Sequence, residues 1–426
     1  MYNYKPVLAT LLTTLIAVVV SYGLKYQQWL SVKNTDWLSD VRTAQPNKKN
    51  LAIYNNSKQA QIHAVIKHYV PTVVDALAHY KTACTQLTQR TRTHVRIAYF
   101  GDSMIEGDII TEYLRTYLQQ TYGGAGVGFV PLSAPTAGYT NSYQLSFTTN
   151  YLAYNFNVRD TVNNYKPYLS GYVFDVAPNT TATSKLALYN TYAKCNFYLL
   201  GYNYNSTTQV VETTVNNKLV QLTLQPFSAF KTLIKSSTTS AAVTVAPYSK
   251  LAYYGLQTEA DTGIVLDNYA FRGSTGMNLS VLNYNLLHQI NVARPYDLVI
   301  VQYGLNIGTN EQQDFSAYQK TMQRVLRYLK KCMPQASFIL VSVGDKCYKQ
   351  NKQWVSAPYI PYLIKTQQAL ADSSAAYFFN LNTTMGGVGG MLTWANADTA
   401  LAQKDYTHIT SAGGKKVAQE LFNLIK

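Results

Sequence analysis

The chain has 426 residues, a formal net charge of +15, 37 tyrosines and 13% charged residues, and 47% of its residues are hydrophobic. This hydrophobic content is typical of a globular protein and excludes a disordered chain. The basic residues are scattered, without a dense basic run or zinc-finger spacing, so nucleic acid is not an expected partner. The positive charge favours an acidic polysaccharide, a cell-wall polymer or a phospholipid surface.

The first apolar run, Val7–Val20, follows Lys5 and predicts a signal peptide or short membrane anchor over residues 1–24. Either segment exports the rest of the chain to the periplasm or the cell surface, and an anchor would tether it to the inner membrane. A buried helix is the less favoured alternative, because the polar stretch Ser31–Asn50 follows. Residues 25–54 are then a linker.

Residues 55–92 have helical periodicity and are predicted to form an N-terminal helical segment, which Pro71 kinks or divides. Three histidines lie in it. His63 and His68 point to different faces, and His68 and His79 are roughly 16 Å apart along the axis. No metal site is therefore predicted from these side chains.

The stretch that organises the chain begins with Val95–Phe100, a short apolar run that predicts a buried strand. Gly101 ends this strand, and Asp102 and Ser103 then lie on a turn into the predicted helix Ile109–Gln120. Open α/β folds place their chemistry at the carboxyl end of such a strand. Asp and Ser are also ordinary helix-capping residues, so the tripeptide alone is a weak signal.

The residues around this turn have other interpretations. Asp102, Glu106 and Asp108 lie close to Ser103 in the sequence. One alternative interpretation is that two of these carboxylates form a pair that cleaves glycosides. Acids stabilised by the dipole at the start of a helix are the favoured interpretation. The Gly-rich run at 123–128 follows a helix and lacks the Lys-Ser/Thr ending of a phosphate-binding loop, so we expect a helix C-terminus and a tight loop.

From residue 140 to residue 262 the pattern changes to short alternating runs separated by Asn, Thr and Ser. This pattern predicts an inserted all-β domain, arranged as a sandwich. The predicted strands are Tyr143–Thr148, Gly171–Val176, Ser184–Tyr189, Asn196–Leu200, Gln209–Thr214, Lys218–Leu224 and Ala241–Ala246. Their tyrosines can stack on sugar rings, although aromatic residues in strands more often serve packing.

An α/β rhythm then returns. The predicted strands are Ile264–Leu266, Asp297–Tyr303, Ser337–Val343 and Ala376–Phe379, and the predicted helices are Leu279–Val292, Phe315–Leu329, Pro361–Ala371 and Ser411–Ile425. Strands that alternate with helices imply a parallel sheet covered on both faces. Residues 93–139 and 263–426 are therefore assigned to one α/β domain that the β domain interrupts.

Four cysteines, Cys84, Cys195, Cys332 and Cys347, show no Cys-x-x-Cys spacing, so neither a metal site nor a redox cofactor is predicted. Cys332 ends a predicted helix, and Cys347 follows the next strand. Seven strand residues span about 23 Å, whereas a disulfide requires Cα atoms within about 7 Å. We therefore expect these two thiols to be free.

Three later stretches lie in loops of the α/β part and carry the groups that acyl transfer requires. They are Asn268–Gly273, Gly304–Asn306 and Asp405–His408. Ser103 would be the nucleophile and His408 its base, and Asp405 would orient the imidazole. The N–H of Gly273 and the amide of Asn306 would join the Ser103 N–H in an oxyanion hole.

These four motifs together resemble the SGNH, or GDSL-type, hydrolase family. The resemblance covers residues 95–139 and 263–426. It implies a three-layer, flavodoxin-like α/β domain with a parallel sheet, and it gives the same roles to the five residues named above. Met104 stands where the family has Leu, and Ala270 where the second motif often has Gly. No G-x-S-x-G elbow is present, so the α/β-hydrolase family is not indicated.

An exported chain with a β insert after the first motif looks like the peptidoglycan O-acetylesterases of this family. The resemblance implies an O-acetylesterase that acts on an acetylated cell-wall or exported polysaccharide and uses no cofactor. A polysaccharide O-acetyltransferase with the same triad remains an alternative, because pocket shape and water exclusion choose the acceptor. A non-catalytic cell-wall-binding protein is a further alternative.

Overall fold

The computed structural model describes residues 75–134, 140–189 and 194–426. The predicted signal or anchor segment, the linker, His63, His68 and Pro71 lie outside the described residues. None of the helices in the described part combines the length and the apolar character needed to cross a bilayer.

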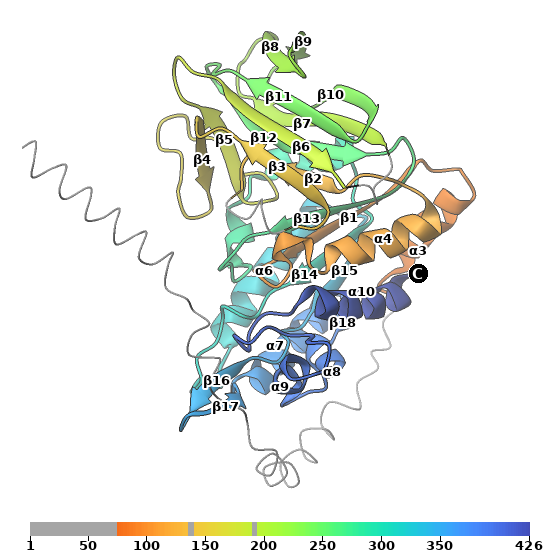
Figure 1. The fold of residues 1–426 in the computed structure, drawn as a ribbon, viewed down its shortest axis with the longest axis vertical. Helices are drawn as coiled ribbons and strands as arrows, with labels where there is room; N and C mark the ends of the chain where they lie inside the picture. The colour runs from red at the N-terminus through yellow and green to blue at the C-terminus, as the bar shows by residue number, and fades with distance from the viewer. Residues whose placement is uncertain (1–74, 135–139, 190–193) are drawn as a thin grey trace, which may run out of the picture. The chain divides into compact units, whose positions relative to one another are not determined.

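A five-stranded parallel sheet forms the centre of the α/β part (Figure 1). Its strands are β1 (His94–Gly101), β13 (Gly263–Ala270), β14 (Leu298–Gln302), β15 (Ser337–Val341) and β18 (Tyr377–Phe379). Their spatial order is β13-β1-β14-β15-β18, and every neighbouring pair is parallel. Numbered along the chain this order is 2-1-3-4-5, which is the flavodoxin-like order and agrees with the arrangement that the family resemblance implied. The strand that leads to Ser103 is thus flanked on both sides.

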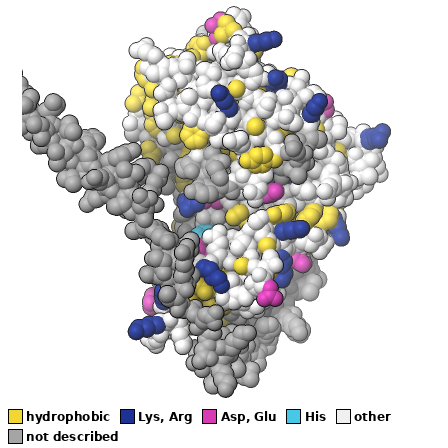
Figure 2. All heavy atoms as spheres, in the orientation of Figure 1, with side chains coloured by type: hydrophobic (Ala, Val, Ile, Leu, Met, Phe, Trp, Pro, Cys, Tyr) yellow, Lys and Arg dark blue, Asp and Glu magenta, His cyan; other side chains and the backbone are white. Residues whose placement is uncertain are grey.

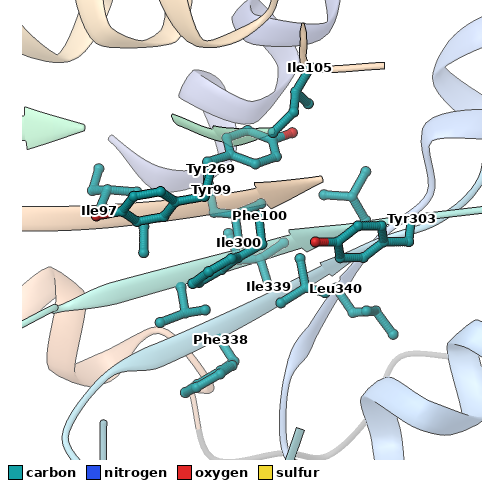
Figure 3. Packing of buried hydrophobic residues seen from close by; sticks show 14 of the residues in the cluster. Ile97, Tyr99, Phe100, Ile105, Tyr269, Ile300, Tyr303, Phe338, Ile339 and Leu340 are labelled. Atoms are coloured by element: carbon teal, nitrogen blue, oxygen red, sulfur yellow. The ribbon is translucent and has the colours of Figure 1, made fainter. Parts of the chain in front are cut away.

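The strands are apolar because both faces of the sheet are covered. Figure 3 shows buried side chains from three neighbouring strands, among them Ile97 and Phe100 of β1, Ile300 of β14, and Phe338 and Leu340 of β15. Each of these side chains is at most 2% exposed. Continuous β-branched and aromatic runs are what such a doubly covered sheet requires.

Helices pack on the sheet in two groups. One group is α4 (Thr111–Tyr122) with α10 (Ser411–Ile425), and the other is α6 (Ser316–Cys332) with α7 (Ile360–Ser373). α4 contacts β13, whereas α7 contacts β15 and β18. The α4 helix ends at Gly123, whose φ of 78° lies in the left-handed region, so the Gly-rich run is a helix C-terminus as predicted.

Several shorter elements complete the α/β part. They are α3 (Ala78–Thr88), η2 (Glu106–Asp108), η3 (Met277–Val281), α5 (Tyr284–Ala293), α8 (Leu381–Met385), α9 (Gly390–Ala395) and a hairpin of β16 (Cys347–Gln350) with β17 (Gln353–Ser356). The single helix predicted over 279–292 is therefore wrong. Asn283 divides it, because its side chain accepts the backbone N–H of Leu286 and caps the start of α5.

The β part consists of two antiparallel sheets. One contains β10 (Ser228–Thr238), β7 (Cys195–Asn203), β12 (Leu251–Glu259), β5 (Tyr172–Val176) and β4 (Tyr151–Asn155), with β2 (Gly128–Pro131) paired to β12. The other contains β3 (Tyr143–Phe147), β6 (Ala182–Leu188), β11 (Ser240–Val245), β8 (Gln209–Val215) and β9 (Lys218–Leu224). Leu186 and Val243 of one sheet share a hydrophobic cluster with Phe197 and Leu256 of the other.

The all-β character of this region agrees with the prediction, but the sequence missed β4, β10 and β12. The predicted limits at residues 140 and 262 remain predictions, and β2, which precedes them, pairs with β12.

The six-stranded sheet also packs against the α/β part. Leu200 and Tyr254 belong to the same hydrophobic cluster as the strands of the parallel sheet. A buried ionic cluster accompanies this apolar contact. Glu259, 2% exposed, accepts hydrogen bonds from Arg96 at 3.3 Å and Arg294 at 3.2 Å and is paired with Lys231.

Burial alone would raise the pKa of Glu259, but the positive charges of Arg294, Arg96 and Lys231 outweigh it and lower the pKa to about 2. A carboxylate whose pKa is lowered by folding stabilises the folded state above its ordinary pKa. That contribution is lost as the pH falls through the pKa of the folded state.

We therefore expect Glu259→Gln to lower the free energy of unfolding at pH 7 by roughly 3–5 kcal/mol, because three buried cations lose their carboxylate. The difference from wild type should shrink as the pH falls from 5 toward 3. Urea unfolding followed by fluorescence measures both values. Asp75→Asn removes an exposed pair with Lys81 and is the control, which should change stability little. An equal effect of both substitutions would contradict the stabilising role of the cluster.

Candidate active site

The Ser103 loop leaves the sheet at Gly101. A Cβ atom at Gly101 would lie 2.8 Å from the side chain of Ile105 and 3.0 Å from the carbonyl oxygen of Gln302, so only glycine lets the turn fold back this closely. The next residue, Asp102, is 1% exposed, and its Oδ1 accepts the backbone N–H of Met104 at 2.9 Å. Burial raises the pKa of Asp102 to about 6. Asp102 thus fixes the turn while Ser103 stays half-buried.

Ser103, His408 and Asp405 are brought together in one hydrogen-bonded chain. The Ser103 Oγ lies 2.9 Å from His408 Nε2, and His408 Nδ1 lies 2.6 Å from Asp405 Oδ2. Because a carboxylate only accepts hydrogen bonds, Nδ1 carries the proton and the Nε2 lone pair faces the hydroxyl. The Ser103 hydroxyl therefore donates to the imidazole.

The Asp405 carboxylate is held by its own loop. Its Oδ1 accepts the backbone N–H groups of Thr407 at 2.9 Å and His408 at 3.0 Å. Burial alone would raise the pKa of Asp405, but these bonds and the bond from the His408 side chain outweigh it and hold the pKa below its ordinary value. The carboxylate is therefore ionised, as an orienting group for an imidazole must be.

A hairpin that the sequence analysis missed supports this loop. Tyr406 has a left-handed φ of 53°. Its carbonyl oxygen accepts the N–H of Cys347 at 2.9 Å, and its ring centroid lies 4.5 Å from that of Trp354. Asn351 and Lys352, both with positive φ, form the two-residue turn between β16 and β17. Asn is common in two-residue hairpin turns, so Asn351 was the feature of the sequence from which this hairpin could have been predicted.

The two predicted oxyanion donors lie in the loops after β13 and β14. Gly273 is exposed, with φ of 75° and open space where a Cβ would stand. Asn306 is exposed, and its Nδ2 donates to the carbonyl oxygen of Ser274 at 3.0 Å. This bond joins the two loops, and a primary amide carries a second N–H for a ligand. The role of both residues in an oxyanion hole stays a prediction.

Two of the acids near Ser103 are engaged in ion pairs. Asp108, 5% exposed, accepts two hydrogen bonds from Arg115 at 2.7 and 2.9 Å, and Glu106 is paired with Arg272. Burial would raise the pKa of Asp108, but the Arg115 charge and its hydrogen bonds lower it. These pairs give the carboxylates structural partners, and glycoside cleavage is not needed to explain them.

Asp108 also connects three parts of the chain. Ser142, at the start of the β part, donates its hydroxyl to Asp108 Oδ2. Asn268 of the second motif donates to the Ile105 carbonyl at 2.9 Å and to the Thr111 hydroxyl at 2.7 Å, beside the same carboxylate. The loop that carries Ser103 is thus tied to β13, to α4 and to the β part.

The cysteines take no part in the site. All four are buried and free, which confirms the prediction for Cys332 and Cys347. Among the described residues, no group of three His, Cys, Asp or Glu side chains is arranged to hold a metal ion.

No protein-family model matches the chain, and no curated protein sequence matches it. A solved structure described as a peptidoglycan O-acetylesterase superimposes with a TM-score of 0.67 and 19% identity, over 82% of this chain and 96% of that chain. The fold of this chain therefore resembles the fold of that O-acetylesterase. Because this match spans 96% of the other chain, the likeness extends over nearly the whole of that esterase.

Two further structures match with low TM-scores, and nothing is inferred from them about this chain. An acetyl xylan esterase matches at 0.29, with 17% identity over 38% of this chain and 82% of that chain. A family two carbohydrate esterase from Cellvibrio japonicus matches at 0.25, with 10% identity over 66% and 98%.

The stacking of Trp354 on Tyr406 generates a test of the loop. We expect Trp354→Ala to slow the labelling of Ser103 by a fluorophosphonate about tenfold, because small displacements of a catalytic group are costly. Trp354→Phe keeps an aromatic ring in the same place and should label at close to the wild-type rate. Mass spectrometry of the labelled peptide measures the rate, and equal rates for all three proteins would show that the hairpin does not position His408.

Proposed function

We propose that the protein is a serine esterase that removes O-acetyl groups from an acetylated polysaccharide, peptidoglycan or another exported polymer. The observation that carries the proposal is the 2.9 Å contact between Ser103 Oγ and His408 Nε2, with Asp405 on the other ring nitrogen. Residues 305 positions apart meet in a geometry that makes a serine hydroxyl nucleophilic.

In the proposed mechanism Ser103 Oγ attacks the acetyl carbonyl carbon while His408 Nε2 takes the hydroxyl proton. The N–H groups of Ser103, Gly273 and the Asn306 amide receive the negative charge on the carbonyl oxygen. The C–O bond to the sugar then breaks, and His408 returns the proton to the departing sugar oxygen. Water, deprotonated by His408, attacks the acetyl-serine, which releases acetate and restores Ser103.

The exposure of the site favours water over a sugar as the acyl acceptor. The side chains of His408 and Asp405 are 32% and 43% exposed. An acetyltransferase must exclude water from its acyl-enzyme. Hydrolysis is therefore the proposed reaction, and transfer to a sugar hydroxyl is the outcome to be tested against it.

Three features support a polysaccharide ester as the substrate. The solved structure that superimposes with a TM-score of 0.67 is described as a peptidoglycan O-acetylesterase. The net charge of +15 favours anionic surroundings such as an acidic wall polymer. The apolar run Val7–Val20, outside the described residues, is typical of an exported chain, which we place in the periplasm or at the cell surface, tethered if that run is retained.

We expect Ser103→Ala to lower the release of acetate from 4-nitrophenyl acetate and from O-acetylated glycans by at least about 1,000-fold, because the nucleophile is lost. Ser280→Ala, an exposed serine of η3, is the matched control and should keep full activity. Circular dichroism of the two variants checks that both are folded. Undiminished acetate release by Ser103→Ala would remove the mechanism, and acetylated oligosaccharide in place of acetate would identify a transferase.

The oxyanion role of Asn306 has its own test. We expect Asn306→Ala to lower kcat roughly 100-fold, equivalent to about 3 kcal/mol of transition-state stabilisation, with little change in KM. Asn423→Ala changes an exposed asparagine near the end of α10 and should leave kcat unaltered. A rise in KM at constant kcat would instead make Asn306 a ground-state binding residue.

A further inference from the structure

A cavity of about 190 Å³ lies beside the Ser103 loop, lined by residues of both the α/β part and the β part. Glu106 is on its wall, and its Cα lies within about 11 Å of that of Ser103, because the two residues are three positions apart in the chain. Arg272, also on the wall, directly precedes Gly273. Ser103 and Gly273 are not themselves lining residues, but each lies within three positions of a residue of the cavity wall.

The polar groups of the cavity are arranged as two ion pairs. Glu106 and Arg272 form one near the solvent, where their side chains are 14% and 67% exposed. Asp108 and Arg115 form the other, where both side chains are buried. The formal charges of these four side chains cancel. The wall thus offers a carboxylate acceptor beside a guanidinium donor without an excess charge of either sign.

The remaining wall is largely apolar and aromatic. Tyr143, Tyr172, Phe129 and Ala270 contribute to it. A ligand pocket typically combines such a lining with a few placed polar groups. At about 190 Å³ the cavity is smaller than the roughly 300–1,000 Å³ of sites for drug-sized ligands, so it has room for about one sugar ring.

The β part fixes the loop that carries this wall. Phe271, 5% exposed, lies with its ring centroid 5.1 Å from that of Phe156 and 5.2 Å from that of Tyr172. Arg272 and Gly273 follow immediately in the chain. Aromatic contacts from the β part therefore hold the loop in which the guanidinium and the proposed oxyanion donor are neighbours.

We propose that this cavity is the subsite for one uncharged pyranose ring of the substrate, and that the Glu106–Arg272 pair binds its hydroxyl groups. The inference rests on the proposed function, because the bound ring presents its acetyl ester to Ser103. A sugar hydroxyl both donates and accepts, so neighbouring hydroxyls match a carboxylate beside a guanidinium. The basic side chains visible in Figure 2 are spread over the face drawn there and form no single patch.

The test compares an uncharged glycan ester with an ester that has no sugar. We expect Glu106→Gln and Arg272→Gln each to lower the ratio of kcat/KM for O-acetylated chito-oligosaccharide to kcat/KM for 4-nitrophenyl acetate at least tenfold. Lys81→Gln, which breaks an exposed ion pair on α3, is the control and should leave the ratio unchanged. A ratio unaltered by both site variants would overturn the subsite.

Binding to the Ser103→Ala protein tests the subsite without any turnover, so that failure of the proposed function is recognised separately. By calorimetry, chito-oligosaccharide should bind at least tenfold more weakly when Glu106→Gln or Arg272→Gln is added. N-acetylmuramic acid, which carries a carboxylate, should bind no more tightly than N-acetylglucosamine. Glu106→Gln should reverse this preference, because it removes the charge that neutralises Arg272. Tighter binding of the carboxylate sugar to the unaltered pair would contradict a subsite for an uncharged ring.

Discussion

The site depends on one constraint, which is that the parallel strands β1, β13 and β14 end in register with one another. Gly101, the last residue of β1, is in register with Ala270 at the end of β13 and with Gln302 at the end of β14. The loops that follow therefore leave the same edge of the sheet side by side. Ser103, Gly273 and Asn306 each lie within four residues of that line, so sheet geometry places all three at the same edge of the sheet.

Buried polar contacts turn this proximity into fixed positions. The Asp108 carboxylate joins the Ser103 loop to α4 through Arg115 and to the β part through Ser142. The His408 loop is fixed on its other side, where the Thr410 side chain accepts the N–H of Gly413 and begins α10. A buried charge that lost its partner would be costly, so these connections resist separation of the two parts of the fold.

The parallel sheet and the three residues of the hydrogen-bonded chain could be predicted, because each depends on a local pattern. Apolar runs mark the strands, and Asp405 lies three residues before His408. The strand β12 was missed because it is buried along its whole length, which removes the alternation used to find strands of the insert. The strand β10 is half-exposed throughout and gives no clear alternation either.

Contacts between distant residues were also beyond sequence reasoning. The sequence analysis placed Glu106 among the acids at the start of a helix and Arg272 in the second motif, and only the fold makes them a pair. The β16–β17 hairpin is short and polar, so its packing under Tyr406 left little trace beyond the Asn351 turn. Local patterns thus identified the proposed reacting groups, whereas the groups that hold them in place depend on tertiary structure.

The central claim is that Ser103 carries the acyl group during turnover. Rapid mixing with 4-nitrophenyl acetate, acid quenching and peptide mass spectrometry measure this directly. We expect an acetyl group on the Ser103 side chain at a level that rises and falls with turnover, and none on the same peptide after His408→Ala. Steady release of acetate with no acetyl group on Ser103, or with the acetyl group on another residue, would contradict the account.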